Sequence, residues 1–166
     1  MILLLRTLLF TIIVPGTVTV VLPAWIRSSD STALPLGALR YLGLFPILAG
    51  TCIYAWCAWD FTFAGKGTPA PIDPPKELVV RGLYRWLRNP MYVGITSILV
   101  GEAWLFASPR LMAYAALVPM LFHLMVVLYE EPTLRRQFGQ VYERYCLTVP
   151  RWVPRRQRRA RESADE

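Results

Sequence analysis

The segment that decides the fold runs from residue 90 to residue 131 and reads PMYVGITSILVGEAWLFASPRLMAYAALVPMLFHLMVVLYEE. It contains two apolar stretches, residues 90–107 and 111–129, joined by the short turn Ser108-Pro109-Arg110. Each stretch approaches the roughly 20 residues that a helix needs to cross the hydrocarbon core of a bilayer. Because so short a turn returns the chain beside itself, the segment predicts an antiparallel hairpin of two membrane-spanning helices.

Two further apolar stretches precede the hairpin, at residues 7–26 and 36–59. The first lacks the small-x-small cleavage site of a signal peptide, so we interpret it as a span. Apolar residues make up 55% of the 166-residue chain and charged residues only 17%, where a soluble domain carries roughly 25% charged residues. This composition excludes a disordered chain and argues against a soluble enzyme. We expect an all-α integral membrane protein with four transmembrane helices in one domain, residues 1–154, and a charged tail, residues 155–166.

The distribution of positive charge predicts the orientation of these spans. Five Lys and Arg lie in the central loop, residues 60–89, and nine follow Tyr129, whereas the other two loops hold three between them. Since positive residues mark the cytoplasmic side, both termini and the central loop are expected to be cytoplasmic. Six arginines lie between Arg151 and Arg161. Because they follow a membrane span, we interpret them as contacts to anionic lipid and not to nucleic acid.

The counts of cysteine and histidine exclude two classes of site. The chain has three cysteines and one histidine. These are too few for a disulfide framework or for a histidine-rich metal site, so no metal is expected.

Asn89 and Pro90 mark the start of the third span. Asn is a favoured N-cap and Pro suits the first helical position, so the helix begins here with free N–H groups at its positive end. Such an end is suited to a carboxylate or a phosphate. The alternative is an ordinary capped helix in which Arg85 and Arg88 extend to the membrane surface.

Two adjacent carboxylates, Glu130 and Glu131, stand where the fourth span meets the cytoplasm. On a regular helix they point about 100° apart. We expect Glu131 to pair with Arg135 one turn on, at the surface. Glu130 then faces the bundle and becomes a candidate for binding the hydroxyls or the amine of a ligand. Apolar residues recur beyond this point at the spacing of an amphipathic C-terminal helix: Leu134, Phe138, Val141, Tyr142 and Tyr145.

Glu102 lies in the middle of the third span, where an ionisable group is costly. It is either buried and protonated beside the small-residue face of its helix, paired with His123 of the neighbouring span, or part of catalysis. The common use of polar groups as interhelical contacts favours a structural pair over catalysis. Gly94, Ser97 and Gly101 on the same helix form a small-residue face suited to close packing.

Two stretches carry a resemblance to a known family. GLYRWLRNPMYVG, residues 82–94, and YEEPTLRRQFGQVYERYCLTVPRWVPR, residues 129–155, resemble the isoprenylcysteine carboxyl methyltransferases and the related phospholipid methyltransferases, over about residues 68–154. The likeness is greatest to short bacterial members. It implies methyl transfer from S-adenosylmethionine in a helical fold of the bacterial inner membrane. The cofactor pocket of the family is built by the loop before the R-[HN]-P-x-Y helix, by the E-E segment and by the amphipathic C-terminal helix.

The resemblance also implies roles for individual residues. Carried over by position, the cofactor-binding residues are Lys76, Glu77, Leu78, Val79, Tyr84, Asn89, Pro90, Met91, Tyr92 and Glu130. If the acceptor needs a base, the candidates are Tyr92, Glu130 and Glu131. The chain departs from the eukaryotic enzymes at two positions. Asn89 stands where they have His, and Val126 stands where they have an Arg attributed to the substrate carboxylate.

The expected function is therefore S-adenosylmethionine-dependent methyl transfer to a hydrophobic or lipid-linked acceptor at the cytoplasmic face of the membrane. Because Val126 replaces the arginine, the sequence leaves the acceptor group open. One alternative is N-methylation of a phospholipid amine. The other is a non-enzymatic membrane scaffold with the same fold.

The charge asymmetry makes the topology testable. In a chain without its own cysteines, a cysteine introduced beside Lys66 should resist a membrane-impermeant thiol reagent added outside intact cells, and one introduced beside Ser29 should react. Labelling near Lys66 from outside would overturn the predicted orientation.

Overall fold

The described part of the chain is helical throughout. The computed structural model describes residues 2–30, 34–64 and 78–154, and the remainder lies outside the described residues. The helices are α1 (Ile2–Gly16), η1 (Thr17–Val21), α2 (Leu22–Ser28), η2 (Gly37–Gly43), α3 (Leu44–Ala64), η3 (Gly82–Arg85), α4 (Pro90–Leu105), α5 (Pro109–Met125), η4 (Val126–Glu130), α6 (Glu131–Phe138) and α7 (Gln140–Thr148).

Three of the four predicted spans form helices long and apolar enough to cross a membrane. In the described residues these helices cover Leu5–Ser28, Gly37–Phe63 and Pro109–Phe138. The remaining predicted span, residues 90–107, forms the 16-residue helix α4. At 1.5 Å per residue α4 is about 24 Å long, shorter than the roughly 30 Å hydrocarbon core. The protein is therefore an all-helical membrane protein with three helices of spanning length and one shorter helix.

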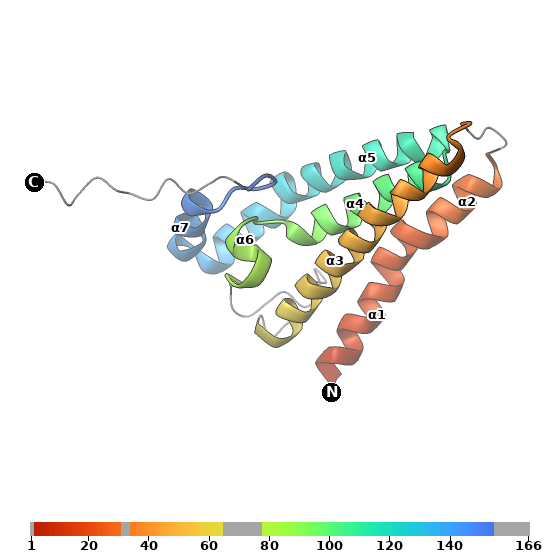
Figure 1. Cartoon of the computed structure of the whole chain (residues 1–166). Coiled ribbons are helices and arrows are strands. Elements are labelled where there is room, and N and C mark those ends of the chain that lie inside the picture. The colour runs from red at the N-terminus through yellow and green to blue at the C-terminus, as the bar shows by residue number, and fades with distance from the viewer. Residues whose placement is uncertain (1, 31–33, 65–77, 155–166) are drawn as a thin grey trace, which may run out of the picture.

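The helices form an elongated bundle with two distinct ends (Figure 1). The N-terminus, the C-terminal end of α3 and helices α6 and α7 lie at one end, which we call the terminal end. The turns from α2 to η2 and from α4 to α5 lie at the other, the turn end. Hydrogen bonds join the segments of the turn end, among them those from Leu34 N to Ala107 O (2.8 Å) and from Trp104 Nε1 to Leu39 O (2.9 Å).

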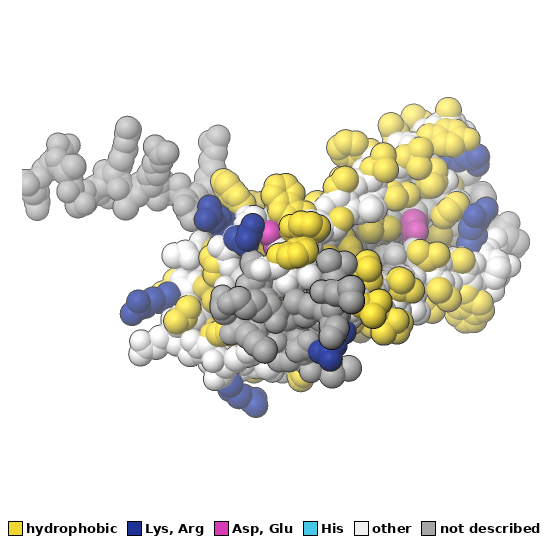
Figure 2. All heavy atoms as spheres, turned by 90° about the horizontal axis from the view of Figure 1, so that it is seen from below, with side chains coloured by type: hydrophobic (Ala, Val, Ile, Leu, Met, Phe, Trp, Pro, Cys, Tyr) yellow, Lys and Arg dark blue, Asp and Glu magenta, His cyan; other side chains and the backbone are white. Residues whose placement is uncertain are grey.

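Large apolar side chains cover the outside of the bundle. Ile12, Phe45 and Leu128 each expose at least 70% of their surface. Soluble proteins rarely expose large contiguous apolar surfaces of this kind. Figure 2 shows hydrophobic side chains spread over one face of the helices, with Lys and Arg near its two ends. This distribution matches a protein whose sides face lipid and whose ends face the membrane surfaces.

Glycines bring α3 and α4 into backbone contact. A Cβ atom added at Gly94 would lie 2.9 Å from the carbonyl oxygen of Gly50, and one added at Gly101 would lie 2.6 Å from that of Gly43. The predicted small-residue face of the third span is thus confirmed at both glycines. Ser97, also on that face, donates to the Val93 carbonyl of its own helix (2.9 Å).

Both π-helical turns end two residues before a proline. The η1 turn closes with a bond from Leu22 N to Thr17 O and precedes Pro23, and η4 closes with one from Glu131 N to Val126 O and precedes Pro132. A proline lacks the N–H and crowds the carbonyl four residues before it, and a wider turn relieves that crowding. The extra residue in each turn changes the direction of the side chains that follow.

The glycine contact predicts a strong response to small substitutions. Gly94→Ala and Gly101→Ala place a methyl group against backbone atoms that cannot rotate away, so each should lower stability by about 1–3 kcal/mol. Gly16→Ala is the matched control, because its added Cβ has its nearest contact at an ordinary 3.5 Å. Thermal unfolding in detergent measures the difference, and equal midpoints for the three variants would contradict the close packing.

Candidate functional site

The start of α4 lies at the terminal end of the bundle, beside the last residues of the described chain. Asn89 occupies the N-cap position and Pro90 follows as the first helical residue, as expected. The Asn89 side chain does not cap the helix, however. Its Nδ2 donates to the Arg151 carbonyl (3.3 Å). Asn89 thus ties the C-terminal segment to α4, and the first-turn N–H groups have no side-chain cap from it.

Two of the candidate site residues, Tyr92 and Glu130, meet across the bundle. The Tyr92 hydroxyl donates to Glu130 Oε1, which joins the first turn of α4 to the last residue of η4. The Tyr92 ring packs on Phe122 of α5 with centroids 4.5 Å apart. Glu130 is half-buried and faces the bundle, so its predicted direction is confirmed.

The expectation for Glu131 is wrong. Glu131 is 7% exposed, and its carboxylate accepts two hydrogen bonds from Arg151, at 2.6 and 2.9 Å. A second cation, Arg88 Nη1, lies 3.1 Å from Oε1. Arg135, the expected partner, instead pairs with Glu143 at 3.2 Å. The physical reason is the π turn η4, whose extra residue rotates the start of α6 and turns Glu131 inward.

Arg88 is a site residue that the sequence placed just before the helix start but did not include among the predicted cofactor-binding residues. Its side chain is 12% exposed, and its Nη1 also donates to Cys146 Sγ (2.9 Å). Its Nε is buried and has no hydrogen-bond partner in the described part of the chain. A buried guanidinium with an unused N–H is a strong donor for an anionic ligand.

The segment before α4 forms another wall of the site. Tyr84 of η3 is buried, and its carbonyl accepts a hydrogen bond from the Tyr145 hydroxyl (2.7 Å), which links η3 to α7. Burial raises the pKa of the Tyr84 phenol well above its usual value, so the hydroxyl stays protonated. Gly82 supports this turn with φ 54°, and a Cβ there would collide with the buried Asp60 carboxylate. The predicted cofactor residues Lys76 and Glu77 lie outside the described residues.

Two adjoining cavities lie among these residues. The smaller, about 60 Å³, is mostly lined by residues of the loop, η4, α6 and α7. The larger, about 290 Å³, extends between α1, α4 and α5 and is near the lower limit of small-molecule sites. The walls common to both are Phe61, Tyr84, Arg88, Asn89, Glu130 and Leu134.

The cavities account for most of the remaining predicted residues. Leu78 and Val79 line the smaller cavity, and Met91 and Tyr92 line the larger. Pro90 is buried beneath the helix start and lines neither. The N-terminal helices supply four further lining residues that the sequence did not indicate: Phe10, Val14 and Pro15 from α1, and Val18 from η1.

Glu102 and His123 do not form the expected pair. His123 is exposed, and its Nδ1 accepts a hydrogen bond from Trp152 Nε1 (3.0 Å). Glu102 Oε2 is buried without a hydrogen-bond partner in the described chain. Glu102 follows Pro90 by twelve residues, about 18 Å along α4, so it lies outside the candidate site.

Comparison with known proteins identifies related sequences. Residues 39–141, more than half of the chain, match the family described as phospholipid methyltransferase. Proteins named "Probable protein-S-isoprenylcysteine O-methyltransferase" from Oryza sativa subsp. indica and subsp. japonica are 33% identical over 120 residues, 70% of this chain and 61% of theirs. "Protein-S-isoprenylcysteine O-methyltransferase B" of Arabidopsis thaliana is 33% identical over 78 residues, 47% of this chain and 40% of its own. The chain spans about three fifths of the length of the rice relatives. No solved structure matches the chain.

The buried ion pair gives a prediction about stability. Glu131→Gln leaves Arg88 and Arg151 facing each other without a counter-charge, which should cost about 3–5 kcal/mol. Arg135→Gln is the matched control, because its pair with Glu143 is half-exposed and worth at most about 1 kcal/mol. Thermal unfolding in detergent compares the two. A small and equal effect of both substitutions would show that Glu131 is a surface residue after all.

Proposed function

Because the chain belongs to the phospholipid methyltransferase family, we propose that it transfers a methyl group from S-adenosylmethionine to a hydrophobic or lipid-linked acceptor at the cytoplasmic face of the membrane. The names of the family and of the relatives indicate a methyltransferase. The donor, the acceptor and the side of the membrane are our inferences. The observation that carries them is the meeting of a helix start without a side-chain cap, an inward carboxylate and an apolar cavity at one place.

The residues at the junction of the two cavities fit the charges of this cofactor. S-adenosylmethionine supplies an electrophilic methyl group on a positively charged sulfur. Arg88 Nε and the first-turn N–H groups of α4 are suited to its carboxylate. Glu130 is suited to accept hydrogen bonds from its ribose hydroxyls or its amino group. Tyr84 and Tyr92 offer electron-rich rings that favour a positive charge.

The larger cavity is suited to the apolar part of an acceptor. Its walls from α1 and α5 are almost entirely hydrophobic, and Tyr92 and Glu130 stand at its polar end. Transfer of a methyl group between two bound molecules needs mainly the alignment of the two molecules and the exclusion of water. An apolar cavity of this kind is suited to both. Where the acceptor must lose a proton, Glu130 is the candidate base, because it is the carboxylate among the lining residues of the larger cavity.

The charged groups that face the two cavities bear on which acceptor group the protein methylates. Val126 is buried in the wall of the smaller cavity, so no guanidinium projects from that position. Arg88 is then the cation available to an acceptor carboxylate, but it is already shared with Glu131. The Glu130 carboxylate favours an amine, so phospholipid N-methylation is our second candidate. The rice and Arabidopsis relatives are named as O-methyltransferases.

We also propose that α4 completes a fourth crossing despite its length. Pro90 lies at the terminal end and Trp104 bonds to Leu39 at the turn end, so α4 extends between the two membrane surfaces. Four crossings place the central loop and both termini on one side, and their positive charge favours the cytoplasm. The rice and Arabidopsis relatives are plant proteins and give no support to the expected bacterial inner membrane.

The cofactor site can be tested with S-adenosylhomocysteine, the product of the reaction, by calorimetric titration of the purified chain in detergent. Glu130→Gln removes a charge-assisted hydrogen bond worth about 1.5–3 kcal/mol, so affinity should fall about 10- to 150-fold. Glu143→Gln is the matched control, because this carboxylate is exposed and lines neither cavity, and it should bind as the unmutated chain does. Absence of binding by the folded, unmutated chain would favour the non-enzymatic scaffold, and equal losses in the two variants would remove Glu130 from the site.

A further inference from the structure

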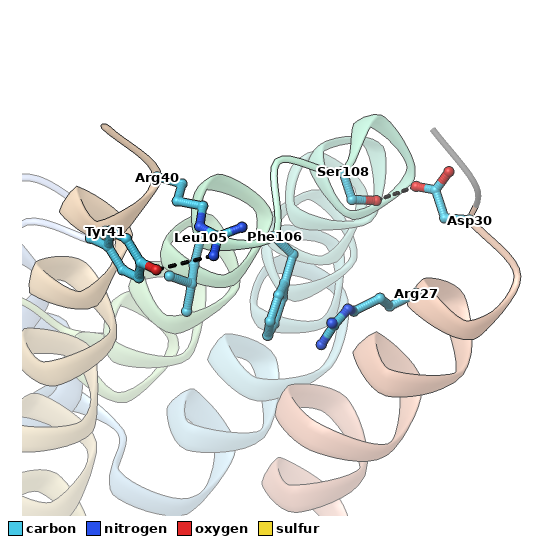
Figure 3. Close-up of a pocket in the computed structure, with 7 residues that line it drawn as sticks. All are labelled: Arg27, Asp30, Arg40, Tyr41, Leu105, Phe106 and Ser108. Carbon is cyan, nitrogen blue, oxygen red and sulfur yellow. Dashed lines mark hydrogen bonds between the residues drawn. The ribbon is translucent and has the colours of Figure 1, made fainter. Parts of the chain in front are cut away.

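A second large cavity lies at the turn end of the bundle, opposite the candidate cofactor site. Its volume is about 410 Å³, and its walls come from α2, η2 and the turn between α4 and α5. The lining residues, drawn in Figure 3, are Arg27, Asp30, Arg40, Tyr41, Leu105, Phe106 and Ser108. Neither the proposed methyl transfer nor the family resemblance assigns a role to this cavity.

Two guanidinium groups reach into this cavity from opposite sides. Figure 3 shows Arg27 of α2 and Arg40 of η2 both extending toward Leu105 and Phe106. The Arg27 guanidinium lies 4.2 Å from the centre of the Phe106 ring, and that of Arg40 lies 4.9 Å from the Tyr41 ring. Arg40 Nη2 also bonds to the Tyr41 hydroxyl (3.1 Å). Contact with an aromatic ring restrains each guanidinium and leaves most of its N–H groups free to donate.

The charges of these arginines are not neutralised within the described part of the chain. Neither Arg27 nor Arg40 takes part in an ion pair there. Asp30, the carboxylate in the cavity wall, accepts a hydrogen bond from Ser108 and lies 3.8 Å from Arg110 Nε. Arg110 in turn donates to the Ser29 carbonyl. The acidic group is therefore held by its own partners, and the cavity keeps an excess of positive charge.

The surface around this cavity is apolar and exposed. Trp25 of α2 exposes 68% of its surface, and Phe45 of α3 exposes 79%. Leu39 and Leu42 of η2 are exposed as well. Trp25, Tyr41 and Trp104 gather at this end as the aromatic side chains of a membrane interface do. A ligand with a charged head and long apolar chains could place the head in the cavity and the chains along these side chains.

We propose that this cavity binds the phosphate group of a membrane phospholipid from the leaflet at the turn end. Arg27 and Arg40 donate hydrogen bonds to the phosphate oxygens from two sides, a geometry to which the planar guanidinium is well suited. The acyl chains extend along the exposed faces of α2 and α3. The site joins α2, η2 and the α4–α5 turn through one ligand, and it is separated from Glu130 by nearly the whole length of α4.

Native mass spectrometry of the full chain, titrated in detergent with dioleoylphosphatidylglycerol, tests this proposal. The unmutated chain should bind one molecule tightly, and dioleoylglycerol, with the same acyl chains but no phosphate, at least tenfold more weakly. Arg27→Gln combined with Arg40→Gln should weaken binding of the phospholipid at least tenfold, because two charge-assisted donors are lost. The matched control, Arg85→Gln combined with Arg136→Gln, removes two exposed arginines at the terminal end and should change the affinity less than threefold.

Three results would overturn the proposal. Equal losses in the two double variants would show general attraction between positive charge and anionic lipid. Equal affinity for dioleoylglycerol would show recognition of the acyl chains alone. Displacement of the lipid by millimolar inorganic phosphate would identify a site for the free anion. If the glutamine variant does not fold, Arg27→Lys combined with Arg40→Lys keeps both charges while losing the planar donors, and unchanged affinity in it would equally count against the proposal.

Discussion

The carboxylate of Glu131 is the group on which the candidate site depends. It accepts hydrogen bonds from Arg151 of the C-terminal segment and lies beside Arg88 of the loop before α4, so it joins three segments that are far apart in the sequence. Removing charged groups from water is costly, and such a cluster persists only because each charge finds a partner. The Asn89 amide adds a bond to the Arg151 carbonyl, and the Tyr145 hydroxyl adds one to the Tyr84 carbonyl. Together these bonds fix the start of α4 against α6 and α7.

The difference between Glu130 and Glu131 shows where sequence reasoning succeeds and where it fails. Hydropathy located the apolar helices, because a helix in lipid must be apolar along its whole length. The helical spacing of 100° per residue placed Glu130 at the inner face. The direction of Glu131 was wrong because it assumed 100° per residue through Pro132, and the π turn before that proline changes the phase of the helix. Prolines near the ends of apolar stretches are therefore the positions at which a regular helical wheel is least reliable in this chain.

Other features of the site depend on contacts that no local pattern carries. Asn89, Pro90, Tyr92 and Glu130 belong to two short motifs, so a resemblance could bring them together. The unused Nε of Arg88 is defined only by the partners that the folded chain supplies to its other nitrogens. The contribution of α1 to the larger cavity is likewise invisible in the sequence, because α1 precedes both motifs by more than fifty residues. Helix α4 ends at Leu105, two residues before the end of the predicted span, because the chain turns from Phe106 onward.

The glycine contact between α3 and α4 has a consequence for how firmly each helix is held in the bundle. Two helices whose backbones touch at Gly43, Gly50, Gly94 and Gly101 cannot slide or separate without losing contact over their whole length. Helix α1 is attached differently, through hydroxyl bonds such as Thr11 to Tyr54 (3.0 Å) and Thr7 to Thr62 (3.0 Å). Individual bonds of this kind are weak in membranes, about 0.6 kcal/mol on average. The α3–α4 pair is therefore the most closely packed part of the bundle, and α1 is held to it by weaker contacts.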